Sequence, residues 1–324
     1  MSWLSILALA LQTAVGFQAA WYALAAVGLN LHFGYTGLSN FGQVGFLLVG
    51  AYGVGIAADQ GWSIWVGFGL GIGAAVLLGL ALGIPTLRLR GDYLAIVTIA
   101  AAEILRLVAN ARPSEPITGG SQGIGGLSKL GFYRPNFIPS GRYGIGNSFV
   151  FNSRQLWAMM WVWGLVILAT LLVRALVRSP WGRVLLAIRE DEDAATALGK
   201  NVVVYKLQSF VLGGTIGAVA GSFVVLYDGA VSPTRWIAPL TFALYTVVIL
   251  GGAGTVWGPI VGAVVYWFIL DVFDGVLNNM WFEVSNTQAG AIRLALMGIG
   301  LMLLMIYRPQ GILGSKKEML AGAR

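Results

Sequence analysis

The chain has 324 residues, of which 57% are hydrophobic and only 10% are charged, and its mean hydropathy is +0.79. Soluble domains carry about 25% charged residues, so this composition excludes a soluble globular protein and predicts an all-α, polytopic membrane protein. The absence of cysteine excludes disulfides and thiolate chemistry, and a single histidine gives no basis for a metal cluster. We therefore expect no metal site.

Long apolar segments separated by turns predict about nine transmembrane spans, within a range of about 8–10. The first Asp, Glu, Lys or Arg is Asp59, which leaves room for two spans before it. No cleavable signal peptide is expected, because no basic region precedes the first apolar stretch. The expected spans are 4–30, 38–58, 62–85, 92–110, 155–177, 207–228, 237–252, 258–279 and 289–307.

Basic residues predict the orientation of these spans. The net charge of +7 concentrates in the loops around Arg88 and Arg90, in 174–206 and in the tail 308–324, which suits membrane orientation better than nucleic-acid binding. We expect these parts in the cytoplasm, with the N-terminus outside and the C-terminus inside. The segment 111–154, rich in Gly and Pro, is then an extracytoplasmic loop.

Glycine is abundant, at 46 residues, and it concentrates in the apolar segments. Small residues allow helix backbones to approach closely in lipid. Several glycine pairs or triplets are four residues apart and so form stripes on one helix face. We expect most of these stripes to pack within the chain and a minority to face a partner subunit or a moving gate. The stripes are Gly213/Gly217/Gly221, Gly67/Gly71, Gly69/Gly73, Gly79/Gly83 and Gly258/Gly262.

A polar cluster at the inner end of the second span is the candidate for a translocation path. Ser39, Asn40 and Gln43 lie among glycines, where a broken helix would expose backbone groups to a water-filled cavity. These side chains either line a path or gate for a polar solute, or form hydrogen bonds between helices. Both alternatives remain open at this point.

Charged residues inside the expected spans have structural interpretations. Glu103 and Arg106 are three residues apart and can pair along one helix face. Asp271 and Asp274 could pair with Arg293 on the last span. His32 is expected to be an interfacial residue rather than a proton relay.

Residues 178–206 form a charged island between apolar stretches. Ser179-Pro180 predicts a helix start, and Gly199 predicts a helix end, so we expect two short helices outside the membrane. The acids Glu190, Asp191, Glu192 and Asp193 face water or a basic surface on a partner. A solvated, self-neutralising loop is the alternative.

Within this island, the residues Asp193-Ala194-Ala195-Thr196-Ala197-Leu198-Gly199 resemble the EAA-x-x-x-G loop of ABC importer permeases, with Asp in place of Glu. The surrounding segments, in order and spacing, resemble the LivM-type permeases, which are membrane subunits of branched-chain amino acid importers. The resemblance covers about residues 20–312. Its segments are GYTGLSNFGQVGF at 34–46, GAY at 50–52, LRLRGDYLAIVTIAAAEILRLV at 87–108, TGGSQGI at 118–124, SPWGR at 179–183, AIREDEDAATALG at 187–199, YKLQSF at 205–210, SP at 232–233 and VILGGAGTVWGPIVGA at 248–263.

The resemblance implies a single permease domain over 1–324, in a bacterial cytoplasmic (inner) membrane. It implies two cytoplasmic ATPase subunits, a second, LivH-like permease subunit, and an extracytoplasmic binding protein that docks on 111–154 and Ser232–Trp236. The residues implied to contact the ATPase are Arg189, Glu190, Asp191, Glu192, Asp193, Ala194, Ala195 and Gly199.

This chain itself is not expected to bind a cofactor. GGSQGIGG at 119–126 lacks the Gly-Lys-Ser/Thr ending of a phosphate-binding loop, so ATP and Mg²⁺ are expected in the partner subunits. The implied cargo is a branched-chain or other apolar amino acid, with urea or short amides as the alternative. An ion-coupled secondary transporter would need an unpaired carboxylate near the membrane midplane, and a membrane enzyme would need a catalytic cluster. Neither class is favoured by the residues.

Overall fold

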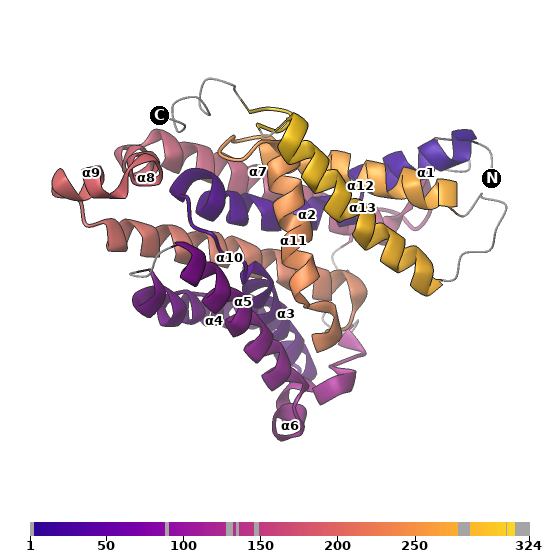
Figure 1. Cartoon of the computed structure of the whole chain (residues 1–324). Coiled ribbons are helices and arrows are strands. Elements are labelled where there is room, and N and C mark those ends of the chain that lie inside the picture. The colour runs from indigo at the N-terminus through magenta and orange to yellow at the C-terminus, as the bar shows by residue number, and fades with distance from the viewer. Residues whose placement is uncertain are drawn as a thin grey trace.

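The structure is a computed structural model that describes residues 3–87, 91–127, 132–133, 136–145, 149–277, 286–308 and 310–314. It is a helical bundle (Figure 1) with one small hairpin. The main helices are α1 (Trp3–Val15), α2 (Phe17–Asn30), α3 (Gln43–Asp59), α4 (Ile64–Thr86), α5 (Gly91–Asn110), α7 (Ser153–Arg178), α10 (Val202–Asp228), α11 (Ala238–Gly251), α12 (Gly258–Leu277) and α13 (Asn286–Tyr307), and the shorter α8 (Pro180–Glu190) follows α7.

The helices match the expected segments, but the count of about nine spans is not confirmed. Among the described residues, five helices are long and apolar enough to cross a membrane, or six if α1 and the segment 17–36 form one bent span. α3 and α11 are apolar but shorter. α3 begins only at Gln43 because the chain at 37–42 is not helical. Arg88 and Arg90, used to predict orientation, lie outside the described residues.

The expected first span, 4–30, is bent once, and a π-helix follows its end. α1 and the following helical segment are bent by 41° at Gly16. α2 then continues into a π-helix over Leu31–Thr36, which ends at Gly37 with φ 75°. A π-helical turn is rare and is frequently found at functional sites. After the π-helix, the non-helical residues 37–42 connect α2 to α3.

α10 is the central helix and packs against α2, α3 and α4. A Cβ atom on Gly221 would collide with the backbone of Leu47 in α3, and one on Gly213 would collide with Gly28 and His32. The stripe on α10 therefore serves packing within the chain, as predicted. Nothing lies within 4 Å of the position that a Cβ atom on Gly69 or Gly73 would take, so this pair on α4 faces away from the bundle.

The segment 111–154, which was predicted to be a flexible extracytoplasmic loop, contains regular secondary structure in its described residues. It contains η2 (Arg112–Ser114), α6 (Glu115–Thr118), η3 (Gly120–Gln122) and the antiparallel hairpin β1 (Arg142–Ile145) and β2 (Phe149–Asn152). Ile124 and Val231 exchange two backbone hydrogen bonds of 2.9 Å. The loop is thereby joined to the connection after α10, next to η5 (Pro233–Arg235). The two segments predicted to form one docking surface are thus adjacent.

Two predictions about charged residues have clear outcomes. Arg106 donates to Glu103 through Nε (2.9 Å) and Nη2 (2.5 Å), which confirms the pair. The prediction that His32 is interfacial is wrong: its side chain is 0% exposed, because the π-helix turns it towards α10. Asp271 and Asp274 lie on α12, but the side chain of Arg293 is outside the described set, so that pairing stays a prediction.

Candidate functional site

Two short helices form the charged island, as predicted. α8 follows α7 directly, and α9 (Glu192–Ala197) follows α8. Ser179 precedes Pro180 with extended backbone, but its hydroxyl donates to Leu176 O rather than capping α8. In Figure 1, α9 lies at the opposite end of the view from α1. The pair therefore marks one end of the bundle.

The apolar face of α8 packs on the π-helix that follows α2 and on α7. Leu185 is fully buried in a cluster with Leu31 and Tyr35 of the π-helix and Val173 of α7. One turn later, Ile188 packs with Ala195 of α9 and Val202 of α10. These contacts fix α8 between the π-helix and α9.

α9 combines a buried inner face with an exposed acidic rim. Asp191 caps the helix by accepting the N–H of Ala194 at 2.9 Å. Glu192 pairs with Lys206 of α10 at 2.5 Å. Ala195, which the resemblance placed at a partner surface, is only 3% exposed and packs inside the chain. Glu190, Asp193 and Ala194 are exposed, which leaves them accessible to a partner.

The end of α9 presents a small and apolar surface. Gly199 has φ 76°, a conformation that other residues adopt only with strain, and nothing lies within 4 Å of the position of a Cβ atom there. The neighbouring Leu198 is 78% exposed. Its role as an exposed apolar tip was missed by sequence analysis, because a leucine before a C-capping glycine is more often part of a buried face.

Arg189 at the end of α8 is exposed like the acidic residues that follow it, but its side chain also reaches the π-helix. Its guanidinium Nη1 donates to the backbone carbonyl of Gly34 in the π-helix. Cβ atoms added to Gly37 and Gly254 would lie 3.2 Å from its Cγ and 2.9 Å from its Nη1, respectively. The side chain predicted to contact an ATPase thus bonds to the membrane bundle.

The polar cluster of the second span lies inside a hydrogen-bonded network. Asn40 and Gln43 are both 0% exposed. Asn40 Nδ2 donates to Gln43 Oε1 (3.0 Å) and contacts His32 Nδ1 (3.1 Å), and Gln43 Nε2 donates to Gly213 O (3.3 Å). His32 Nε2 lies 3.0 Å from Phe210 O, so a neutral ring that donates from Nε2 and accepts at Nδ1 satisfies every contact.

This network favours hydrogen bonding between helices as the role of Asn40 and Gln43 in this conformation. Ser39 is half-buried. A translocation path along these residues remains a prediction, and it would require the network to open.

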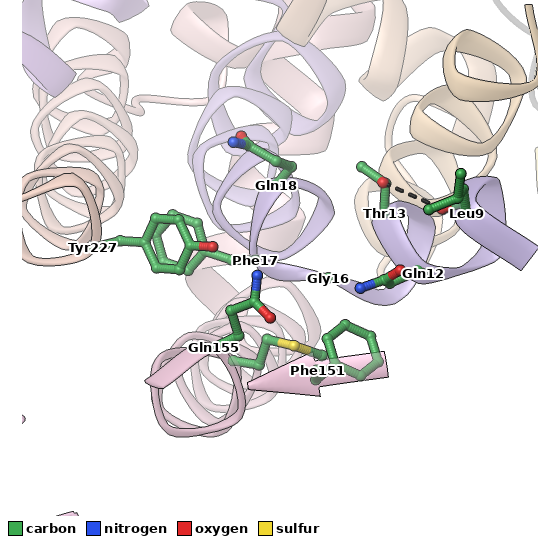
Figure 2. A pocket seen from close by; sticks show the side chains of 10 residues that line it. Leu9, Gln12, Thr13, Gly16, Phe17, Gln18, Phe151, Gln155 and Tyr227 are labelled. Carbon is green, nitrogen blue, oxygen red and sulfur yellow. Dashed lines mark hydrogen bonds between the residues drawn. The ribbon is translucent and has the colours of Figure 1, made fainter. Parts of the chain in front are cut away.

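A cavity of about 260 Å³ lies at the bend between α1 and α2 (Figure 2). The stacked rings of Phe17 and Tyr227, with centroids 3.9 Å apart, form one wall, and Gln12 and Gln155 lie beside it. Its lining residues carry no charge. The cavity therefore suits a neutral, partly apolar group better than a zwitterion.

Comparisons with known proteins agree with the resemblance. The family described as "Branched-chain amino acid transport system / permease component" matches residues 12–307. The high-affinity branched-chain amino acid transport system permease protein LivM of Salmonella typhimurium is 32% identical over 301 residues, covering 90% of this chain and 67% of that protein. A probable LivM of Methanocaldococcus jannaschii is 27% identical, covering 91% of each chain. LivH of Escherichia coli is 25% identical, covering 90% of this chain and 91% of that protein.

Proposed function

Because the chain belongs to the family of branched-chain amino acid transport permeases, we propose that it is one membrane subunit of an ATP-driven importer. Its cargo in this proposal is a branched-chain or other apolar amino acid. The observation that carries the proposal is the family match over residues 12–307, together with the exposed helix pair α8–α9 at one end of the bundle. The chain itself is a transport subunit rather than an enzyme.

The α8–α9 pair is the proposed contact with a cytoplasmic ATPase. Glu190 and Asp193 are exposed acids that would attract a basic surface, since charged pairs at an interface set orientation and association rate. Gly199 and Ala194 leave room for close approach. ATP and Mg²⁺ bind to the ATPase subunits in this proposal, and closure of the ATPase pair moves α8 and α9.

The remaining partners follow from the same assembly. A LivH-like permease would complete the membrane unit, and a soluble binding protein would deliver the amino acid to the surface formed by the outer loop and Ser232–Trp236. This arrangement places α8–α9 in the cytoplasm, the N-terminus outside and the C-terminus inside a bacterial cytoplasmic membrane. Ser39, Asn40 and Gln43 are the proposed path or gate residues, and they would separate from one another when the path opens.

Purification from the native membrane in a mild detergent, followed by mass identification of retained proteins, tests the assembly. We expect two ATPase subunits and a second permease. Reconstitution of that complex with its binding protein should give leucine uptake that requires ATP. A lone chain that carries solute without ATP would overturn the proposal and return attention to Asp271, Asp274 and Glu103 as ion-coupling residues.

A further inference from the structure

We propose that Arg189 is a positioning residue that fastens the α8–α9 pair to two backbone segments of the bundle, the π-helix Leu31–Thr36 and the turn 252–255. This inference rests on the proposed function, because it names the residue through which movement of α8 would reach the membrane helices. The two segments are more than two hundred residues apart in sequence, and they are joined where Gly254 N donates to Asn30 Oδ1, one residue before the π-helix.

The guanidinium of Arg189 lies at the point where the two segments meet. It donates to Gly34 O of the π-helix, and a Cβ atom on Gly254 would be 2.9 Å from its Nη1. Its stem crosses Gly37, whose φ of 75° ends the π-helix. A planar guanidinium offers five N–H donors in a fixed geometry, so it can hold such a junction more rigidly than a lysine ammonium.

Asn30 holds the same two segments together from the other side. Its Oδ1 accepts the N–H of Gly254 and its Nδ2 donates to Thr255 O, both at 2.9 Å. A Cβ atom on Gly34 would collide with Asn30 Oδ1 and with Gly254 N, so the close approach requires glycine. Asn30, Gly34, Arg189 and Gly254 therefore form one compact junction.

The junction leads to elements that would have to move during transport. The turn 252–255 connects α11 to α12. The π-helix carries His32, which contacts Asn40 next to Gln43. Leu185 of α8 is buried against the same π-helix, so α8 is packed there as well as hydrogen-bonded. A shift of α8 would therefore move the start of α12 and the polar network at the same time, because close-packed elements move together.

The first test compares R189A and R189K with the control R183A in the reconstituted complex with its binding protein. Arg183 lies on the same helix and is exposed. We expect R189A to copurify with the ATPases and to hydrolyse ATP, but to transport roughly tenfold less amino acid per ATP, within the usual range of coupling between sites. R189K should fall between R189A and the native protein, and R183A should match the native protein. Native coupling in R189A would overturn the inference.

A second measurement follows movement directly and does not require uptake. The chain has no cysteine, so spin labels can be placed at A187C on α8 and at W257C, immediately before α12. We expect the distance between the labels to stay the same when ATP binds to the native complex, and to change with ATP in R189A. An equal change in both proteins would overturn the inference.

The two measurements separate the inference from the proposed function. If the native complex carries no amino acid, the proposed function fails, while the label distances still decide whether Arg189 fastens α8 to α12. If the native complex transports and R189A transports equally well per ATP, only the inference fails. If R189A does not assemble, both measurements are made on R189K.

Discussion

Lys206 Nζ lies 2.5 Å from Glu192 Oε2, and this ion pair joins α9 to the first turns of α10. The Lys206 side chain is 10% exposed, whereas that of Glu192 is 51% exposed. The pair therefore has one end in the protein and one in water. Together with the apolar contact of Ala195 with Val202, it holds α9 against the bundle.

Replacing Glu192 with Gln should loosen α9, because Lys206 would keep its charge in a buried position without its partner. We expect the free energy that holds α9 against α10 to fall by about 1–2 kcal/mol, which lies between the contributions of exposed and of buried ion pairs. Hydrogen exchange of the amides at 192–198 measures this effect. E190Q is the control, since it removes an exposed acid at the end of α8. Equal protection in the two variants would show that the pair does not hold α9.

Replacing Gly199 with Val should uncouple ATP hydrolysis from uptake while the protein still inserts and assembles. The positive φ makes valine cost about 1–2 kcal/mol at this position, and its side chain would project into the space proposed for the ATPase. G61V is a matched control, because Gly61 also has a positive φ (70°) and open space but lies in the α3–α4 loop. We expect G61V to transport normally. Measured uptake per ATP distinguishes the two, and a similar loss in both would indicate strain alone.

Replacing Gly213 with Ala should destabilise the bundle. The added methyl group would collide with His32 and with Gly28 O, where α10 crosses α2, and overpacking of this kind costs about 1–3 kcal/mol. The control is G69A, which adds the same group where nothing lies within 4 Å. Thermal unfolding in detergent should show a lower midpoint for G213A only. A native midpoint for G213A would mean that α10 and α2 separate easily.

Replacing Glu103 with Gln should lower stability more than it changes substrate preference, because the carboxylate is engaged by both Nε and Nη2 of Arg106. The side chain of Glu103 is 43% exposed and that of Arg106 is 18% exposed, so we expect the free energy of unfolding to fall by about 1 kcal/mol. E115Q, on the exposed helix α6, controls for the loss of one acid. Competition uptake with several amino acids, measured beside thermal unfolding, provides the check. A changed preference with native stability would give Glu103 a role in transport.

Several features were predictable from the sequence because they depend on local chemistry. Pro180 and Gly199 predicted α8 and α9 through the backbone conformations that these residues favour. Glu103 and Arg106 predicted their pair because residues three apart share a helix face. The stripe Gly213/Gly217/Gly221 predicted close helix packing, but the sequence contains nothing that names Gly28, Gln43 and Leu47 as its neighbours.

The membrane class, the approximate positions of the helices and the family could all be predicted from the chain, since apolar length, turn residues and motif order are local properties. The burial of His32, the inward orientation of Ala195 and the hydrogen bond from Arg189 to Gly34 follow from the way the helices pack. Such contacts depend on which helices lie side by side. A charged side chain next to a short polar loop can face either water or a backbone carbonyl, and for Arg189 the packing of α8 against the π-helix brings that carbonyl within reach.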